Sequence, residues 1–179
     1  MAGTYVALLY SIGIGEGRRL IMADWRSMME DLGFQNPRTL IATGNAIFEC
    51  RVAAIRTLEH QLEVAFDRRF GRRVDTIVRA AASFRRLTAG NPFPRESERD
   101  GACVVVRVMR KPLDRESVAA LTRYLTQDER LEVVQGDLWV HFRQDPARSR
   151  LLPLLASQRL GIGTVRNWNT IRRLNGMLG

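Results

Sequence analysis

Cysteine and histidine are scarce in this chain of 179 residues, with two of each. Cys50 and Cys103 lie far apart in apolar surroundings, where they form no Cys-x-x-Cys pair and have no neighbouring His. Such cysteines are typical of small core residues in a reducing cytosol, and they offer neither a disulfide framework nor a zinc-binding motif. We therefore expect no metal site and no cofactor.

Signatures of common catalytic sites are also missing, including the Gly-x-Ser-x-Gly of many hydrolases. The Gly-rich stretch at residues 13–17 lacks the Gly-Lys-Ser/Thr of a phosphate-binding loop, and Arg18 stands where the dinucleotide fingerprint has its third glycine. We interpret that stretch as a connecting loop. His60 lies beside Glu59 and Glu63, which is not an i, i+4 ligand pair, so we interpret it as part of a solvated helix face.

No run of apolar residues is long enough to span a membrane. The first ten residues lack the basic start of a signal peptide, and charges from Glu16 onward interrupt the apolar run. With 45% hydrophobic and 26% charged residues, the composition is that of an ordinary soluble globular protein of one large domain or two smaller ones. We expect a cytoplasmic protein with no membrane partner.

Lysine is nearly absent, since Lys111 is the only one, and the net charge of +9 is carried by arginine. The excess is concentrated near the C-terminus, where seven Arg accompany a single acid, Asp145, for a local net charge of +6. These are Arg143, Arg148, Arg150, Arg159, Arg166, Arg172 and Arg173. A concentrated basic surface attracts phosphate-bearing partners, either nucleic acid or a small molecule. The alternative is that the Arg content reflects a GC-rich genome and that these side chains are merely solvated.

Apolar periodicity and turn residues predict the elements of the first half of the chain. They are a strand at residues 5–12, a helix at 22–32, a hairpin at 39–50 around Gly44-Asn45, a helix at 55–70 and a strand at 74–78. Gly33 and Gly71 are predicted to end the two helices. Residues 83–89 are predicted to form one or two further helical turns.

The second half repeats this order. It has a strand at 102–109, a helix from Asp114 through Leu125, a hairpin at 131–142 around Gly136-Asp137, an apolar helix at 148–160 and a short strand at 164–165. Asn167 is predicted to cap a final helix at 168–178. The order predicts an α+β fold of two ferredoxin-like βαββαβ units in tandem, packed together, with an extra C-terminal helix. The expected domains are residues 1–90 and 102–179, joined by a Pro-rich, charged linker at 91–101.

One strand of the second half places Trp139, His141 and Arg143 on the face opposite Leu138, Val140 and Phe142. In a ferredoxin-like unit one sheet face is left uncovered by helices, and aromatic residues on that face stack bases in RNA-recognition domains. No ribonucleoprotein motif supports that comparison here. The alternative, which we favour, is that this face is covered and Trp139 is an ordinary core residue.

The stretch Arg166-Asn167-Trp168-Asn169-Thr170 has two interpretations. In the structural one, Asn167 caps the last helix and Trp168 anchors it. In the functional one, Arg166 and the helix N-terminus hold a phosphate or carboxylate while Asn169 contacts polar groups of the ligand. The predicted ligand-binding residues are Arg79, Arg150, Arg166, Asn167, Trp168 and Asn169.

Several stretches together resemble the bacterial family called domain of unknown function 1697. They are residues 5–9, 22–34, 43–48, 77–79, 91–93, 139–141, 149–151 and 166–170. The resemblance implies that family's α+β fold and no established activity. The chain departs from the family at residues 10–16, where the family usually carries Arg-Gly-Ile-Asn-Val-Gly-Gly. An anion site that used that Arg and Asn would be changed or lost here.

These observations support two functional hypotheses. The first is a soluble binding protein for an anionic ligand, a nucleic acid or a nucleotide, that uses the C-terminal Arg/Asn/Trp cluster. The second is an enzyme that acts on a small phosphorylated or carboxylated metabolite in a cleft between the two halves, with His141 as the proton carrier. A protein-interaction module remains the third alternative.

Overall fold

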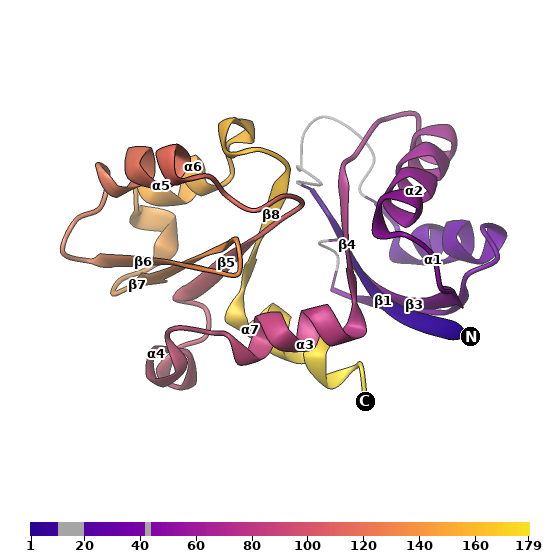
Figure 1. Cartoon of the computed structure of the whole chain (residues 1–179), viewed down its shortest axis with the longest axis horizontal. Coiled ribbons are helices and arrows are strands. Elements are labelled where there is room, and N and C mark those ends of the chain that lie inside the picture. Colours follow the sequence, from indigo (N-terminus) through magenta and orange to yellow (C-terminus); the bar gives the residue numbers. More distant parts are fainter. Residues whose placement is uncertain (11–19, 42–43) are drawn as a thin grey trace. The chain divides into compact units, whose positions relative to one another are not determined.

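The computed structural model describes residues 1–10, 20–41 and 44–179. The Gly-rich loop at 13–17 and most of the departure at 10–16 therefore lie outside the described residues. Within the described ranges the fold is mixed α+β, with two four-stranded antiparallel sheets and seven α-helices (Figure 1). The chain divides into two compact units, residues 1–85 with 174–179, and residues 86–173. None of the described helices is long and apolar enough to cross a membrane.

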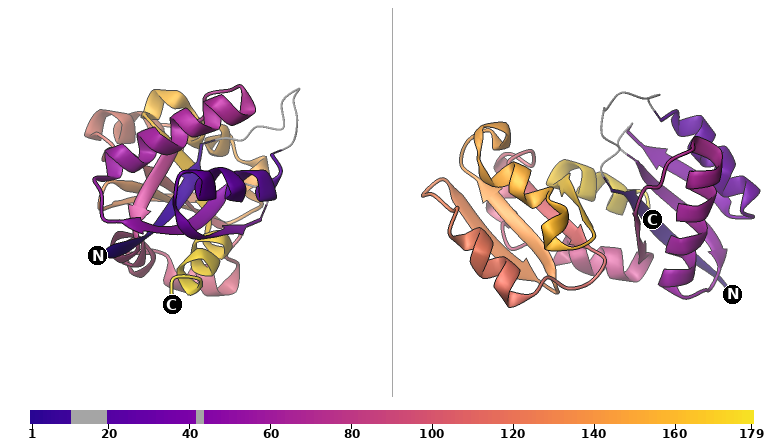
Figure 2. Two further views of the ribbon diagram at one scale, coloured as in Figure 1. Left: turned by 90° about the vertical axis from the view of Figure 1, so that its right-hand side faces the viewer. Right: turned by 90° about the horizontal axis from the view of Figure 1, so that it is seen from above.

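The first unit contains a sheet of strand order β2-β3-β1-β4 with two helices on one face (Figure 2). Its elements are β1 (Ala2–Leu9), α1 (Met22–Asp31), β2 (Gln35–Leu40), β3 (Asn45–Arg51), α2 (Ile55–Phe70) and β4 (Thr76–Ala80). Gly33 and Gly71 follow the two helices with φ of 78° and 68°, so both predicted helix ends are confirmed. The left-handed conformation at these positions suits glycine because it has no Cβ.

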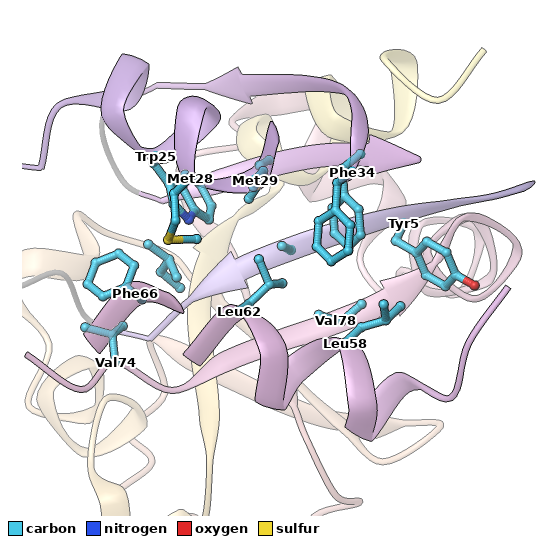
Figure 3. Close-up of a cluster of buried hydrophobic side chains, with 14 of the residues drawn as sticks. Tyr5, Trp25, Met28, Met29, Phe34, Leu58, Leu62, Phe66, Val74 and Val78 are labelled. Atoms are coloured by element: carbon cyan, nitrogen blue, oxygen red, sulfur yellow. The ribbon is translucent and has the colours of Figure 1, made fainter. Parts of the chain in front are cut away.

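The core of the first unit lies between α1, α2 and the sheet (Figure 3). The helices contribute apolar residues at the three- and four-residue spacing that places them on one face. They are Trp25, Met28 and Met29 from α1, and Leu58, Leu62 and Phe66 from α2. The rings of Phe34 and Phe48 stack beneath them at a centroid distance of 4.5 Å. This packing confirms the amphipathic helices that the sequence predicts.

The second unit contains a sheet of strand order β6-β7-β5-β8. Its strands and helices are α4 (Pro94–Arg99), β5 (Val104–Met109), α5 (Arg115–Thr122), β6 (Glu129–Val134), β7 (Asp137–Phe142), α6 (Leu151–Leu155) and β8 (Gly163–Asn167). Two further helices, α3 (Ala81–Ala89) and α7 (Trp168–Gly176), have residues in both units. The segment 91–101, predicted as a linker, contains α4, which begins with Pro94 at the first helical position.

Both predicted hairpins are present, and the second turn precedes the Gly136-Asp137 position by one residue. Asn45 and Asp137 are the first residues of β3 and β7, and both are buried. The Asn45 side chain donates to the carbonyl of Leu40 at 3.1 Å, and the Asp137 carboxylate accepts from the backbone N–H of Met109 at 2.7 Å. The second turn consists of residues 135–136, both with positive φ. Each polar residue therefore fixes a strand end.

The apolar helix predicted at residues 148–160 is interrupted. It consists of a 3-10 turn at Pro146–Arg148, the helix α6, and a second 3-10 turn at Gln158–Leu160. Arg107 on β5 is fully buried beneath this segment and donates to the carbonyls of Leu155, Ser157 and Gly161. In a regular helix these carbonyls would accept from backbone N–H groups of the following turn. Here the Arg107 guanidinium satisfies them instead.

Candidate functional site

The C-terminal stretch has a clear structural role at one position. The Asn167 side chain accepts hydrogen bonds from the backbone N–H and the hydroxyl of Thr170, each at 3.0 Å. Asn167 therefore caps α7, as the sequence predicts. Its carboxamide oxygen is engaged in this cap, which leaves only its NH₂ group for a ligand.

Arg166 lies on β8 and is half-buried. Its guanidinium donates to the hydroxyl of Thr164 at 2.6 Å and to the carbonyl of Val165 at 2.8 Å. Burial lowers the pKa of Arg166 to about 10, so the side chain stays charged at neutral pH.

Trp168 and Asn169 pack against the loop that precedes β5. A Cβ added to Gly101 would lie 2.4 Å from Oδ1 of Asn169 and 3.1 Å from Cδ1 of Trp168. The Trp168 ring also lies 6.1 Å from the ring of Trp139, measured between centroids. Trp139 itself is 1% exposed, so it is a core residue and cannot stack bases. The helix-terminal pair thus fixes the position of Gly101.

The other two predicted residues lie apart from this stretch in the chain. Arg150 is exposed and immediately precedes α6. Arg79 lies on β4 of the first unit, opposite Val6 of β1, and is partly buried. The structure therefore brings together residues 166–169 as a continuous segment of β8 and α7, whereas Arg79 belongs to a different compact unit from the other five.

A hollow of about 690 Å³ lies within the second unit, and we call it the His141 hollow. It is lined by Glu96, Arg99, Asp100, Cys103, Arg130, His141, Phe142 and Arg143. Its volume falls within the range of about 300–1,000 Å³ that is usual for ligand pockets. Its lining has three arginines and two carboxylates, so its net charge is positive. The Gly101 loop, held by Trp168 and Asn169, forms part of its wall between Asp100 and Cys103.

His141 and Arg130 are direct cross-strand partners on β7 and β6. Leu138, Val140 and Phe142 belong to the helix-covered core, which confirms that His141 points to the opposite face of the sheet. Arg130 forms an ion pair with Glu96 and lies over the Phe93 ring, with its guanidinium carbon 5.1 Å from the centroid. The Phe93 ring is 5.9 Å from the His141 ring. Aromatic contact and an ion pair therefore fix one side of the hollow.

The electrostatics of the hollow disfavour the charged form of His141. Burial lowers its pKa below the usual 6.5, and the positive charges of Arg130 and Arg143 lower it further, while Glu96 opposes them. Nδ1 of His141 is buried and has no hydrogen-bond partner among residues 1–10, 20–41 and 44–179. An unpartnered buried ring nitrogen is costly to the folded chain.

Cys103 is not an activated nucleophile. Its thiol donates to the Asp100 carboxylate at 3.3 Å. Burial raises the pKa of the Cys103 thiol, and the Asp100 carboxylate raises it further. Because the reactive form of cysteine is the thiolate, these contacts make the residue inert at neutral pH. The described part of the chain also holds no group of three His, Cys, Asp or Glu residues that could bind a metal ion.

Three basic or aromatic residues of this region were not among the predicted site residues. Arg99, Arg130 and Phe93 reach the hollow or its edge from α4, β6 and the turn before α4. Arg130 and Glu132 are two residues apart in the strand, which is a weak signal for a polar strand face that carries Arg130. No local pattern indicates the contact between α4 and Arg130, because it joins residues 34 positions apart.

Comparisons with known proteins agree with the fold. The conserved bacterial protein SP0830 from Streptococcus pneumoniae has a similar structure, with a TM-score of 0.77, 23% sequence identity and 99% of each chain covered. At that identity the likeness shows the fold alone. No match was found among curated proteins. Residues 2–139 match the family model described as Protein of unknown function (DUF1697), so the resemblance inferred from the sequence is confirmed and the chain belongs to that family.

Proposed function

We propose that this protein binds an anionic ligand, a nucleotide or nucleic acid, and that the His141 hollow receives the anionic group. The observation that carries the proposal is the convergence of Arg99, Arg130 and Arg143 on one hollow of about 690 Å³. Several cations around one concave surface attract anions because low-dielectric walls focus their field. The volume also suits a mononucleotide or the terminal nucleotide of a chain.

The arginines of the hollow differ in their availability. The Arg130 guanidinium is paired with Glu96. The guanidinium groups of Arg99 and Arg143 are exposed and make no hydrogen bond or ion pair with any residue that the structure describes. Arg99 and Arg143 therefore can meet a ligand without first breaking a contact within the protein, and bidentate pairing suits guanidinium to phosphate.

The predicted ligand-binding residues would contribute to binding in three ways. Trp168 and Asn169 support the Gly101 loop of the hollow, and Asn167 fixes the helix on which they lie. Arg166 would add a half-buried positive charge to the same unit. The two remaining residues, Arg79 and Arg150, would contribute to long-range attraction of a polyanion.

Binding can be tested with a pair of double variants of equal charge. Arg99→Gln with Arg143→Gln should weaken binding of AMP and of a short labelled RNA by about a hundredfold or more, because each of the two lost charge-assisted hydrogen bonds contributes about 1.5–3 kcal/mol. Arg115→Gln with Arg123→Gln removes two exposed charges on and just after α5, on the helix-covered side of the sheet. Calorimetry with AMP and fluorescence anisotropy with RNA should show a much smaller loss in that control. Equal losses in both pairs would contradict a site at the hollow.

His141 gives specific support to a second candidate, an enzyme that acts on a small phosphorylated metabolite. A histidine with an unpartnered ring nitrogen in a hollow is a suitable proton carrier. Cys103 adds nothing to such an activity because its thiol is held protonated. Turnover of a phosphorylated metabolite that disappears in His141→Gln while binding persists would favour this candidate over simple binding.

We also propose that the two sheets belong to two ferredoxin-like domains. The element order βαββαβ and the strand order β2-β3-β1-β4 in the first unit support this topology, and β6-β7-β5-β8 repeats the order in the second. The proposed domain limits are residues 1–90 and 102–179, with 91–101 between them. Separate expression of the two segments, followed by measurement of cooperative unfolding, tests this division.

A further inference from the structure

We propose that the ligand presents a terminal phosphate monoester to the His141 hollow, and that His141 takes up a proton when this group binds. The inference rests on the function proposed above and specifies both the chemistry of the ligand and the pH dependence of the site.

The spacing of the cations suits a single compact, doubly charged group. Arg130 and His141 are direct cross-strand partners, which places their Cβ atoms about 5 Å apart. Arg143 is two residues beyond His141 in the chain, about 7 Å away for an extended backbone. A phosphate monoester carries about −1.5 to −2 charges and three acceptor oxygens at neutral pH. A phosphodiester has one negative charge and two such oxygens, so it engages fewer of these donors.

The charged and titratable groups around His141 come from four segments. Glu96 and Arg99 belong to α4, Arg130 to β6, Arg143 follows β7, and Asp100 and Cys103 precede β5. Glu96 is engaged by Arg130, and the Asp100 carboxylate accepts from the backbone N–H of Ala102 at 2.9 Å and from the Cys103 thiol. The free cations thus prevail over the free carboxylates, and they disfavour a charge on His141 in the empty hollow.

A bound phosphate reverses this balance. Its negative charge compensates the arginines, so the pKa of His141 rises and the protonated ring can donate to a phosphate oxygen. The His141 ring lines the hollow and has no described hydrogen-bond partner, so donation from the side of the ring that faces the hollow would break no protein contact. By linkage, a rise of about one pKa unit makes the monoester bind about tenfold tighter to the protonated protein than to the neutral one.

The affinity should therefore increase as the pH falls toward about 6. Below that value the phosphate loses its second charge, since its own second pKa is about 6, and the gain should level off. A ligand held only by arginines would bind less tightly once the phosphate loses its second charge, but its affinity would not first increase as the pH falls toward 6. The pH dependence therefore separates a proton-linked site from simple attraction by a basic surface.

Nuclear magnetic resonance of the two histidines tests this directly. The Hε1 signals of His60 and His141 can be followed across a pH titration of the intact protein without ligand, with AMP, and with 3′,5′-cyclic AMP as a phosphodiester. His60 is exposed on α2 and serves as an internal control. The variant His60→Gln assigns the remaining signal to His141.

The expected result is that AMP raises the pKa of His141 by about one unit, that cyclic AMP raises it much less, and that neither moves His60. If calorimetry shows AMP binding but His141 titrates unchanged, or cyclic AMP shifts it equally, the inference is overturned while the proposed function stands. If neither nucleotide nor RNA binds at low salt, both are overturned. In His141→Gln, AMP should bind more weakly than to the natural chain at pH 6, and its affinity should no longer increase as the pH falls from 8 to 6.

Discussion

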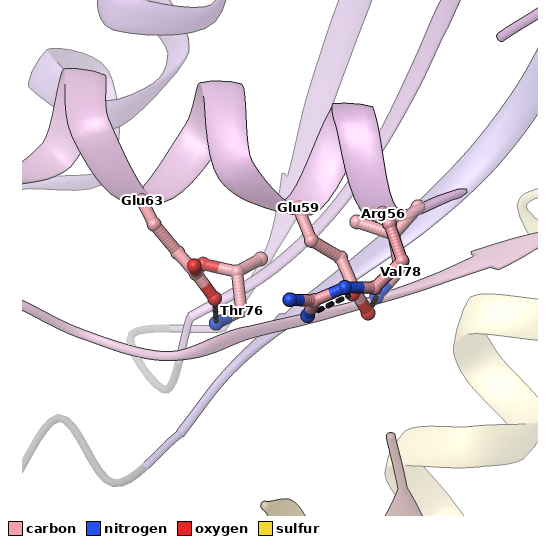
Figure 4. A network of polar contacts seen from close by, with 5 residues as sticks. All are labelled: Arg56, Glu59, Glu63, Thr76 and Val78. Carbon is pink, nitrogen blue, oxygen red and sulfur yellow. Dashed lines mark hydrogen bonds and ion pairs between the residues drawn. The ribbon is translucent and has the colours of Figure 1, made fainter. Parts of the chain in front are cut away.

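Glu59 on α2 accepts a hydrogen bond from the backbone N–H of Val78 on β4, with Oε1 3.2 Å from the nitrogen (Figure 4). One turn later, Glu63 accepts from the backbone N–H of Thr76 at 3.0 Å. Four residues of helix rise about 6 Å, and two residues of strand span about 6.7 Å, so the two carboxylates match alternate N–H groups of the strand. Because β4 is an edge strand, these two N–H groups are not paired within the sheet, and the two carboxylates satisfy them instead.

Removal of the Glu59 acceptor should destabilise the first unit. Glu59 is 2% exposed, so Glu59→Leu would leave the Val78 N–H buried without a partner, at a cost of about 1–3 kcal/mol. Glu59→Gln keeps a side-chain oxygen and should lose less. Urea unfolding measures both, and Glu30→Gln on the exposed end of α1 is the control for loss of one charge. Equal stability of Glu59→Leu and the natural chain would contradict this role.

Arg107 should be necessary for the irregular segment after α6. In Arg107→Met the carbonyls of Leu155, Ser157 and Gly161 lose a buried charged donor, and we expect a loss of about 1–3 kcal/mol for each carbonyl left buried without a partner. Arg107→Lys keeps the charge but not the planar fork, so its loss should be intermediate.

Hydrogen exchange distinguishes this local effect from a general one. Amides of residues 156–161 should exchange faster in Arg107→Lys, whereas amides of the first unit should not change. Uniform acceleration throughout the chain would show that Arg107 stabilises the fold without any special relation to this segment.

Gly101→Ala tests whether the helix-terminal pair Trp168 and Asn169 positions the wall of the hollow. The new methyl group would meet Oδ1 of Asn169 at 2.4 Å, so the loop or the helix start must move, at a cost of about 1–3 kcal/mol. Gly176→Ala is the matched control, because a Cβ there meets nothing within 4 Å and alanine favours the helix by up to about 1 kcal/mol. Thermal unfolding should show a lower midpoint temperature for Gly101→Ala and no loss for Gly176→Ala. A neutral Gly101→Ala would contradict the close contact.

Local signals allowed most of the elements to be predicted from sequence. Gly71 ends α2 and Asn167 caps α7 because each depends on neighbours within a few residues. The burial of Arg107 and Glu59 could not be predicted in this way, since a charged residue normally indicates a solvated surface. Their partners lie 48 and 19 residues away, so only the tertiary structure shows them to be buried donors and acceptors.

For the candidate site, the sequence predicted the strand face of one residue but not the burial or the long-range contacts of others. Strand alternation placed His141 on the correct face of the sheet, because a period of two needs no knowledge of the fold. The same argument could not show that Trp139 is buried, since burial depends on what covers the face. Nor could it bring Glu96 of α4 to Arg130 of β6.

Glu96→Gln should strengthen anion binding. Glu96 engages Arg130 and competes with any ligand for that guanidinium, so its neutralisation should lower the Kd for AMP by about threefold to tenfold at low salt. Glu98→Gln changes the same charge at an exposed position of the same helix and is the control. Calorimetry that shows equal gains would assign the effect to long-range charge. Weaker binding in Glu96→Gln would contradict the proposed competition.

His141 should make the stability of the folded chain depend on pH. Burial, with Arg130 and Arg143, lowers its pKa in the folded state below the value of about 6.5 expected for the unfolded chain. The unfolded chain therefore binds the proton more readily, so this contribution to stability is complete above pH 6.5 and is lost as the pH falls through the folded-state pKa. The free energy of unfolding of His141→Gln should fall less between pH 7 and pH 5 than that of the natural chain. His60→Gln, which alters an exposed ring, should follow the natural chain; if it matched His141→Gln instead, the buried ring would not be the source of the pH dependence.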